Sequence, residues 1–493
     1  MKIKHKLCGL VLCLMLAPSS QLEAQKRTLS YRAEAIGMAS DGQFAPLWFT
    51  ANRHGVLSNQ DAQAALRAGI FYRQELNHQW NVQAGFDLNW GAGLLPDFGI
   101  QQAYADISWK ELTLSIGAKE RIGGPLDKNP LLTGGWMVEG PNTRPVPQAR
   151  LELDHYWKVP GLHEWVALKG HIAYGRITDD NWQRDFVGAN QKFVQDVLYH
   201  SKSLMFRIGR RQSIPVEFEF GMITGSQFGG KRYKKEADGT IRLQKRFPNG
   251  FKEFFKVFIP KQNGTIENVG GNHCGSWNFA LNVYAGEWKF RTYLEHYFED
   301  HSQMFWEYGR WKDGQLGFEV SLPKNRWLSS VVWEGLSTKD QTGSILYDGV
   351  GGSFTDVQVS GNDHYYNNHE YLGWQYYGSS LGHPFLYGPQ YNSDRSNSIK
   401  STRIRSNHLG LQGQPANEWK WRLLASFVRH WGTYFEPLDK QRKQFSSMLE
   451  VTYQPQWIQG WSASLSLGLD RGNYLGNNTG AMLTLRKVGG FNL

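Results

Sequence analysis

Cysteine is scarce in this chain of 493 residues: it has three, and two of them lie in the apolar N-terminal segment. Without that segment Cys274 stands alone, and no intramolecular disulfide can form. Long apolar runs are also absent, because none after the first 20 residues approaches the roughly 20 residues that a membrane-spanning helix needs. These absences exclude a disulfide-stapled scaffold and a helical membrane protein.

Catalytic signatures are absent too. The sequence has no G-x-S-x-G, no P-loop, no H-E-x-x-H and no paired cysteines. Glu295–His301 resembles a metal or acid–base cluster, but on a strand Glu295 and Glu299 face one way and His296 the other. We interpret this stretch as a strand that runs into a loop, and we expect no enzyme, no cofactor and no metal site.

The first 24 residues have the pattern of a secretory signal peptide. Three lysines precede an apolar core from Leu7 to Ala17, and Leu22-Glu23-Ala24 leads to an expected new start at Gln25. No cysteine lies at the cleavage point, so a lipoprotein is not expected. Loss of three lysines and one glutamate lowers the formal net charge from +10 to +8. We expect residues 25–493 to form one exported domain.

Aromatic residues and glycine are abundant, with 20 Trp, 22 Tyr, 27 Phe and 54 Gly at a mean hydropathy of -0.51. The predicted hairpin Leu66–Trp90 shows how they are arranged. In Val82–Trp90 every even position is apolar or aromatic and every odd position is polar or glycine, so the strand has one apolar and one hydrophilic face. Leu66–Leu76 repeats the alternation, and Asn77-His78-Gln79 makes the turn.

This alternation recurs in nearly every predicted strand. A soluble antiparallel sheet can also alternate, but repeated dyads of about ten residues with aromatic girdles are the signature of an outer-membrane β-barrel. We therefore predict an all-β antiparallel transmembrane barrel of about 18 strands, monomeric, in the Gram-negative outer membrane. The clearest predicted strands are Leu29–Gly37, Leu66–Leu76, Trp80–Trp90, Gln102–Trp109, Leu112–Lys119, Gln148–Asp154, Trp165–Tyr174, Phe290–Phe298, Trp461–Asp470 and Ala481–Arg486.

Two long connections separate the early strands, Met38–Gln63 and Gly123–Pro147, whereas Lys110-Glu111 forms a tight turn. If the N-terminus is periplasmic, the tight turns fall on the periplasmic side and the long loops outside, as in known barrels. The prolines of the second connection exclude a central strand and favour a rigid extended segment.

The basic charge indicates anionic partners. Lipopolysaccharide or an acidic polysaccharide would fit, and so would the phosphates of outer-membrane lipid at the barrel rim. Nucleic acid is not expected. Gln227–Gly250 is especially basic, with Lys231-Arg232-Tyr233-Lys234-Lys235 and Lys245-Arg246. It is either a loop that binds a polyanion or a solvated loop that faces lipid phosphates.

The most informative polar stretch is Asp363–Tyr377, which continues to Gly382-His383-Pro384-Phe385. Sugar recognition uses aromatic faces that stack on pyranose CH groups, together with amides and carboxylates that bond hydroxyls. This stretch is rich in both kinds of side chain. The alternative is that its tyrosines form an aromatic girdle or a packed plug.

Four stretches together resemble the capsule-assembly Wzi family, in the form common in Bacteroides-type bacteria: Pro46–Gly55, the loop ending Asn142-Thr143-Arg144-Pro145-Val146-Pro147, Tyr293–Asp300 and Tyr365–Phe385. The resemblance implies an outer-membrane barrel of about 18 strands with a closed lumen. It also implies a lectin, not an enzyme, that holds or organises capsular or exopolysaccharide at the cell surface. Polysaccharide export machinery is a further implied partner.

One departure from that family concerns the lumen. The better-known members carry a periplasmic helical bundle that plugs the barrel, whereas only Asn59–Leu66 has helical character here. Loops would then have to close the lumen, and Met38–Gln63 and Gly123–Pro147 are the best candidates.

Our first hypothesis is a polysaccharide-binding barrel. Its predicted contact residues are Asn142, Arg144, Tyr293, Glu295, Tyr365, Tyr366, Asn368, Glu370 and Trp374. The second hypothesis is a porin for oligosaccharides or small anionic solutes, with Arg67, Arg73, Arg291 and Glu295 lining a conducting eyelet. The third is a barrel enzyme that acts on lipid or glycan.

Overall fold

The computed structural model describes residues 27–258, 271–299, 304, 312–341 and 364–493. The predicted signal peptide lies outside the described residues.

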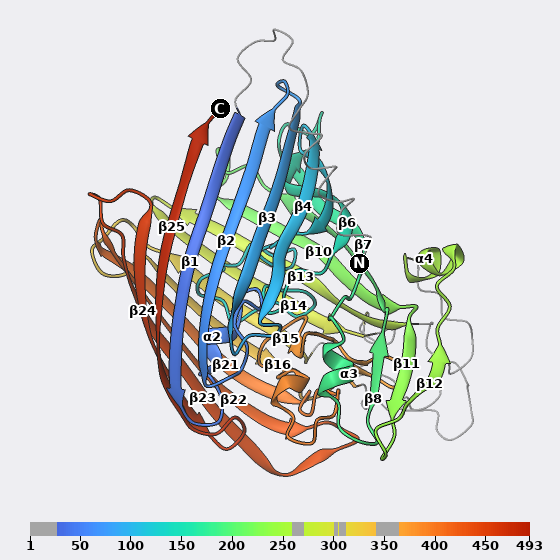
Figure 1. Cartoon of the computed structure of the whole chain (residues 1–493). Coiled ribbons are helices and arrows are strands. Elements are labelled where there is room, and N and C mark those ends of the chain that lie inside the picture. The colour runs from blue at the N-terminus through green and yellow to red at the C-terminus, as the bar shows by residue number, and fades with distance from the viewer. Residues whose placement is uncertain (1–26, 259–270, 300–303, 305–311, 342–363) are drawn as a thin grey trace.

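Eighteen antiparallel strands form one closed barrel (Figure 1). Each strand pairs with its neighbours in the chain, and β1 closes the ring by pairing with both β2 and β25. The barrel strands are β1 (Arg27–Asp41), β2 (Ala62–Glu75), β3 (Trp80–Ala92), β4 (Phe98–Trp109), β5 (Leu112–Ala118), β6 (Gln148–Lys158), β7 (Val166–Arg176), β9 (Leu198–Ile208), β10 (Val216–Phe228), β13 (Asn272–Ala285), β14 (Trp288–Phe298), β15 (Gly314–Ser321), β16 (Ser330–Ser337), β21 (Ile404–Ala416), β22 (Trp419–Gly432), β23 (Pro437–Tyr453), β24 (Trp461–Gly472) and β25 (Asn478–Asn492).

The predicted strands and the predicted fold are confirmed. Both turns, at 77–79 and 110–111, lie where the alternation placed them, and the strand count is 18. The real strands are longer than predicted: β1 continues to Asp41 and β25 begins at Asn478, because each extends beyond the apolar band.

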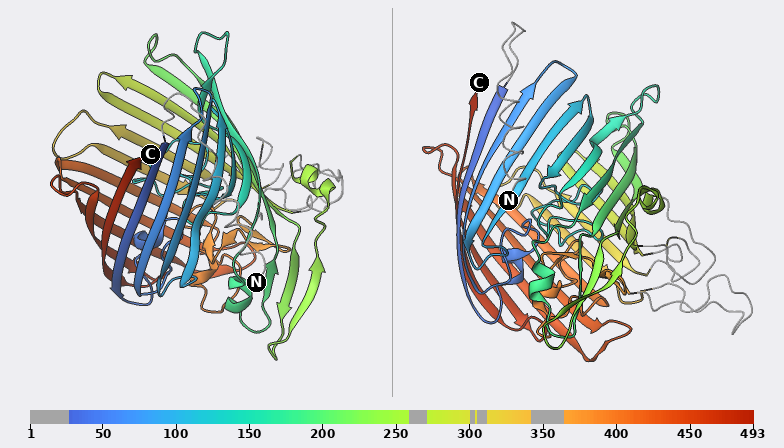
Figure 2. Two further views of the ribbon diagram at one scale, coloured as in Figure 1. Left: turned by 45° about the horizontal axis from the view of Figure 1, so that its top comes forward. Right: turned by 45° about the vertical axis from the view of Figure 1, so that its right-hand side comes forward.

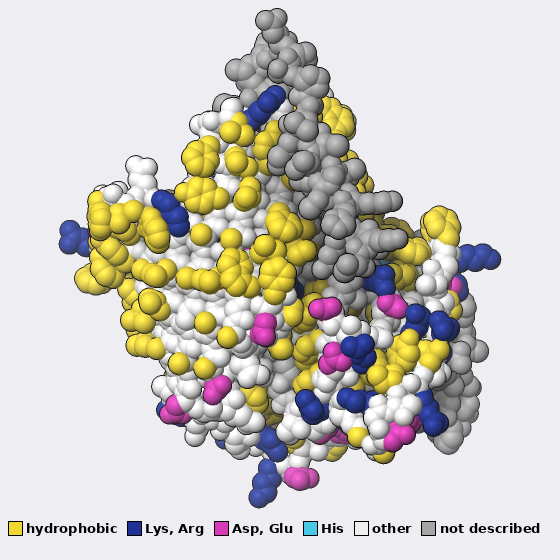
Figure 3. All heavy atoms as spheres, in the orientation of Figure 1, with side chains coloured by type: hydrophobic (Ala, Val, Ile, Leu, Met, Phe, Trp, Pro, Cys, Tyr) yellow, Lys and Arg dark blue, Asp and Glu magenta, His cyan; other side chains and the backbone are white. Residues whose placement is uncertain are grey.

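The outward face carries the apolar half of each alternation. Along β3, Trp80, Phe86 and Trp90 are exposed while Asp87 and Asn89 are buried inside. The ten residue steps from Trp80 to Trp90 span about 33 Å of strand, which at a tilt of about 40° gives a band about 25 Å tall. Figure 3 shows this band as yellow side chains over the face formed by β25 and β1 to β3, with charged side chains gathered below it.

The two ends of the barrel differ. At one end, here called the short-turn end, every connection is short: 76–79, 110–111, 159–165, 209–215, 286–287, 322–329, 417–418 and 454–460. The opposite end, here called the long-loop end, carries the connections 42–61, 119–147, 177–197, 229–271 and 338–403. In outer-membrane barrels the short turns are periplasmic and the long loops extracellular. The long-loop end therefore faces the outside of the cell.

Helices are few and short. Those whose full extent lies in the described residues are α2 (Leu47–Thr50), α3 (Trp182–Phe186) and α4 (Phe251–Phe258), with a 3₁₀ turn η2 (Pro389–Tyr391). The expected helical character at Asn59–Leu66 is wrong, because the chain there is irregular and then enters β2. Within the described part of the chain, no helix is long and apolar enough to cross a membrane.

The basic stretch Gln227–Gly250 is a hairpin, which corrects its interpretation as a loop. β11 (Lys231–Lys235) and β12 (Ile241–Arg246) pair with each other, and β11 also pairs with β8 (Lys192–Gln195). This small sheet stands outside the barrel wall at the long-loop end (Figure 1).

Candidate functional site

Three connections from the long-loop end fold back into the barrel: 42–61, 119–147 and 364–403. We call them the plug; they lie inside the lower part of the barrel in the views of Figures 1 and 2. Large side chains of all three are fully buried. One apolar cluster joins the three connections: Leu47, Trp48 and Phe49 of the first, Met137 and Val138 of the second, and Tyr365, Tyr366, Trp374 and Phe385 of the third. The expectation that the first two connections occupy the lumen is confirmed. The third connection also lies in the lumen, with the short two-residue pairs β17 (Asn367–Asn368), β18 (Leu372–Gly373), β19 (Gln375–Tyr376) and β20 (Ser379–Ser380).

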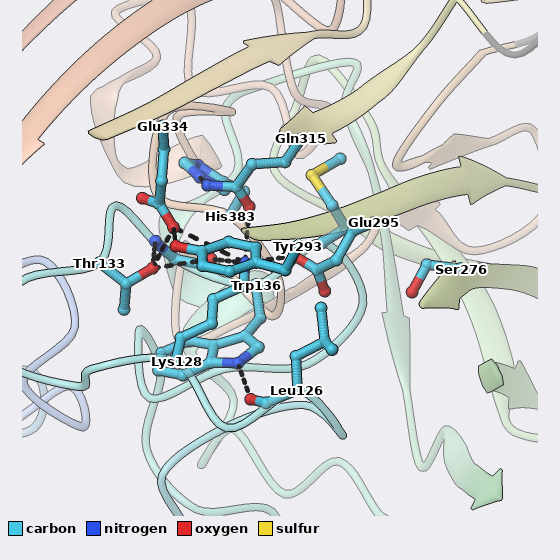
Figure 4. Close-up of polar contacts among 12 residues, drawn as sticks. Leu126, Lys128, Thr133, Trp136, Ser276, Tyr293, Glu295, Gln315, Glu334 and His383 are labelled. Carbon is cyan, nitrogen blue, oxygen red and sulfur yellow. Dashed lines mark hydrogen bonds and ion pairs between the residues drawn. The ribbon is translucent and has the colours of Figure 1, made fainter. Parts of the chain in front are cut away.

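A buried lysine joins the second connection to the barrel wall (Figure 4). Lys128 Nζ donates to a carboxylate oxygen of Glu295 on β14, to Gln315 Oε1 on β15 (2.7 Å) and to the Gly135 carbonyl oxygen (2.7 Å). The side chains of Lys128 and Glu295 are 0% and 1% exposed. An ion pair removed from water in this way is held by its hydrogen bonds, and removal of one partner would leave a buried charge.

A second carboxylate completes this cluster. Glu334 on β16 accepts hydrogen bonds from the Tyr293 hydroxyl (2.5 Å), the Thr133 hydroxyl (2.7 Å) and the Gly134 backbone amide (2.5 Å). Its nearer oxygen lies 3.9 Å from Lys128 Nζ. Both acids of the wall therefore accept hydrogen bonds from the plug.

The first connection is bound in the same manner to strands β22 to β24, which follow β16 and β21 around the barrel wall. Arg53 donates to Glu450 on β23 (2.9 Å), which also accepts from Arg422 on β22 (2.7 Å). The backbone amide of Leu47, at the start of α2, donates to Asp470 on β24 (3.1 Å).

A third anchor is Glu139 in the second connection. It accepts hydrogen bonds from Arg150 (3.2 Å), Tyr199 (2.9 Å) and Ser201 (2.9 Å). Burial alone would raise the pKa of Glu139. The charges of Arg150 and His171 and the two hydroxyl hydrogen bonds outweigh burial and lower the pKa to about 2. Glu139 is therefore an anion at all physiological pH values and holds the plug to β6, β7 and β9.

Three predicted contact residues lie in the centre of the plug. Tyr365, Tyr366 and Trp374 are 0%, 1% and 0% exposed. The Tyr366 hydroxyl donates to the Met137 carbonyl oxygen, and Trp374 Nε1 donates to the Val138 carbonyl oxygen (2.8 Å). These contacts are those of a packed plug, which was the alternative interpretation of this stretch. Their binding of polysaccharide stays a prediction.

The other predicted contact residues have partners of their own. Asn142 donates to the Ser380 carbonyl oxygen (3.0 Å), and Arg144 donates to the Ile100 carbonyl oxygen (2.9 Å). Tyr293 and Glu295 belong to the Lys128 cluster. The structure thus brings these four residues into the plug and its wall.

Glu370 and Asn368 lie nearer the surface. Glu370 is 19% exposed and joins the plug to the basic hairpin by accepting from Arg232 (2.7 Å) and Lys245 (2.6 Å). Burial acts to raise the pKa of Glu370, but the two cations lower it. The Asn368 side chain accepts from the Glu370 amide (2.8 Å) and shapes the local turn.

The residues proposed for a conducting eyelet do not meet. Arg67 and Arg291 are 6% and 2% exposed and are paired with Asp87 and Glu219 on the wall. Arg73 lies at the short-turn end with its side chain 58% exposed.

Sequence reasoning missed an aromatic surface at the long-loop end, here called the mouth platform: Trp182, Asp185, Phe186, Tyr377, Asp394 and Arg395. Trp182 and Phe186 stack at 4.5 Å across one turn of α3. An added Cβ on Gly378 would lie 2.5 Å from the Trp182 ring, so α3 rests directly on the third connection. The two rings and Tyr377 are half-buried, whereas Asp185, Asp394 and Arg395 are exposed.

The signal that could have found the platform is the aromatic pair four residues apart among acids and amides, in the stretch DDNWQRDF. One turn of helix brings such a pair together. Among the described residues, no group of three or more His, Cys, Asp or Glu side chains is placed to hold a metal ion.

A closed 18-stranded barrel with an apolar outer band is an outer-membrane β-barrel. No family model and no curated protein sequence matches this chain. Its structure is similar to that of Wzi, an outer-membrane protein involved in group 1 capsule assembly in Escherichia coli and a carbohydrate-binding β-barrel. The TM-score is 0.54 at 14% sequence identity, and the match covers 92% of this chain and 83% of Wzi. It is also similar to the outer-membrane protein OpdK from Pseudomonas aeruginosa (TM-score 0.45, 11% identity, 96% of this chain and 100% of OpdK). At 14% identity the likeness to Wzi shows the fold alone.

Proposed function

We propose that this protein is a non-enzymatic, non-conducting barrel that binds capsular or exopolysaccharide at the cell surface. The observation that carries the proposal is the plug: three connections fill the lumen, are tied to the wall by buried ion pairs, and present the mouth platform to the outside. A conducting eyelet would instead need its charged groups in water along an open path. The Escherichia coli barrel that shares this fold binds carbohydrate, and the proposal extends that property to this chain.

The mouth platform is the part of the surface best suited to a sugar chain. The Trp182–Phe186 stack and Tyr377 offer aromatic faces for pyranose CH groups. Asp185, Asp394 and Arg395 are exposed beside them and can bond hydroxyls or carboxylates. Because the platform rests on the plug, a glycan bound there would be held by a rigid surface.

A binding experiment tests the proposal. The purified barrel is screened on an array of bacterial surface polysaccharides, and the affinity for any hit is measured for Trp182→Ala and Tyr377→Ala. We expect each variant to bind at least about tenfold more weakly, as for an aromatic anchor at the centre of a contact. Trp457→Ala is the matched control, since Trp457 is 77% exposed at the short-turn end.

Conductance in a planar bilayer separates the proposal from its main alternative. We expect the wild-type barrel to be silent. A steady open channel would favour the porin. Unaltered glycan binding by both platform variants would show that the mouth platform is not the binding site. Release of new reducing ends from a bound polysaccharide would instead support the third hypothesis, that the barrel is an enzyme.

A further inference from the structure

The outer wall of the barrel carries a row of cations that the proposed function does not use. Arg405 on β21 pairs in register with Arg429 on β22, which pairs with Lys443 on β23. Arg471 follows on β24, opposite Phe445 and therefore two positions from that rung. All four are exposed. We call Arg405, Arg429 and Lys443 the outer cation row.

Burial shows that these side chains point away from the lumen. On β22 the even positions Ser426, Val428 and His430 are buried at 0% to 1%, so Arg429 lies on the opposite, lipid-facing side. The same parity holds on β21, where Leu409 is exposed, and on β23, where Leu449 is exposed.

The row lies at a defined height. Arg429 is ten residues from Trp419 on β22, Lys443 is ten residues from Tyr453 on β23, and Arg471 is ten residues from Trp461 on β24. In each strand the aromatic residue is at the short-turn end. Ten tilted residues span the roughly 25 Å of the apolar band. The cations therefore lie where the hydrocarbon of the outer leaflet gives way to its headgroups.

Like charges directly opposite on neighbouring strands destabilise a sheet unless something compensates them. Among the described residues, no carboxylate forms a salt bridge with Arg405, Arg429 or Lys443. Arg429 has only the Phe427 ring beneath it, 5.8 Å from its guanidinium carbon. The missing counter-charge must come from the surroundings, and at this height the surroundings are lipid headgroups.

A groove of about 400 Å³ continues from this row along the outer wall toward the short-turn end. Arg405 and Arg429 line the groove nearest the long-loop end, Trp333 lines it nearest the short-turn end, and Asn407, Leu316 and Leu294 lie at one rung between them. Lys312 and Asp313 also line it, and Asp313 is 1% exposed. Glycine at position 335 and serine at position 337 leave room between the larger side chains. The cations lie toward the long-loop end of the groove and the apolar side chains toward the short-turn end. This order matches a lipid whose phosphorylated headgroup lies at the membrane surface and whose acyl chain enters the hydrocarbon layer.

We propose that the outer cation row and this groove form a binding site for lipopolysaccharide, with the phosphates of lipid A on Arg405, Arg429 and Lys443 and an acyl chain along Trp333. Guanidinium groups bond phosphate in bidentate fashion, which suits two arginines at one rung. The site would fix the barrel in the outer leaflet on the side opposite α4 and the basic hairpin.

The test compares two triple variants of the full-length barrel purified in detergent. Arg405→Gln/Arg429→Gln/Lys443→Gln removes the row, and Arg73→Gln/Lys110→Gln/Lys420→Gln removes three exposed cations from the short-turn end. Bound lipid is measured by native mass spectrometry during titration with bisphosphorylated lipid A. We expect the row variant to bind at least about tenfold more weakly and the control to bind like wild type.

Three results would overturn the proposal: unchanged binding by the row variant, an equal loss in the control, or equal binding of dephosphorylated lipid A. Competition by inorganic phosphate alone at equal concentration would likewise show an unspecific anion site. Heat-modifiable migration on a gel verifies that each variant is folded. Arg405→Lys/Arg429→Lys keeps the charge but loses the bidentate bonds, so its affinity should lie between those of wild type and of the row variant.

Discussion

Removal of the Lys128 ammonium should loosen the plug without unfolding the barrel. Lys128→Met keeps most of the apolar stem between the Trp136 and Tyr293 rings but removes three hydrogen bonds and the partner of Glu295. Breaking a buried ion pair by removing one member destabilises by about 3–5 kcal/mol. At 1.4 kcal/mol per power of ten, the loosened plug becomes roughly two to four powers of ten more populated.

Single-channel recording in a planar bilayer detects this change. We expect Lys128→Met to show brief openings that the wild type lacks, with the barrel still heat-modifiable. Lys110→Met is the control, because Lys110 is an exposed lysine in a tight turn. The double variant Lys128→Met/Glu295→Gln should be quieter than Lys128→Met, since it no longer buries an unpaired charge. A silent Lys128→Met, or a double variant that opens just as often, would refute the reasoning.

Two further predictions concern the plug. Because the pKa of Glu139 falls from 4.5 to about 2 in the folded protein, its contribution of about 3 kcal/mol should be present above pH 4.5 and be lost as the pH falls toward 2. Urea unfolding between pH 6 and 3 should therefore show a weaker acid dependence for Glu139→Gln than for wild type; equal slopes would contradict this. Gly382→Ala should destabilise the plug by about 1–3 kcal/mol, because the new methyl group would overlap the Tyr366 hydroxyl and the Met137 carbonyl oxygen. Gly250→Ala, with no atom within 4 Å, is its control, and limited proteolysis of the plug measures both.

The barrel could be predicted from the sequence because the residue pattern that produces it lies within each strand. A strand with one face in lipid must alternate with period two, so Val82–Trp90 shows its fold in nine residues. The length of the apolar segment can also be read within a single strand, because the thickness of the membrane determines it. This is why strand positions, both tight turns and the count of 18 agree with the structure.

The plug could not be predicted in the same way because its contacts join distant residues. Lys128 and Glu295 are 167 positions apart, and Tyr366 and Met137 are 229 apart. Nothing in the local pattern of either residue specifies the other. The expectation that loops would fill the lumen came from the lack of a helical bundle. It identified two of the three connections, but not the third and not the side chains that hold them.

The stretch from Tyr365 to Trp374 shows why composition alone cannot distinguish a sugar site from a plug. Both need aromatic faces in contact and every polar group hydrogen-bonded, so both select tyrosine, tryptophan and amides. The difference lies in what supplies the partners. For Tyr366 and Trp374 the carbonyl oxygens of Met137 and Val138 accept the bonds that hydroxyls of a sugar would otherwise accept. On the mouth platform Asp185 and Asp394 are exposed to water, although Asp185 pairs with Arg184 and Asp394 with Lys400. A glycan is therefore expected to bind at the platform, and the buried tyrosines act by keeping its support rigid.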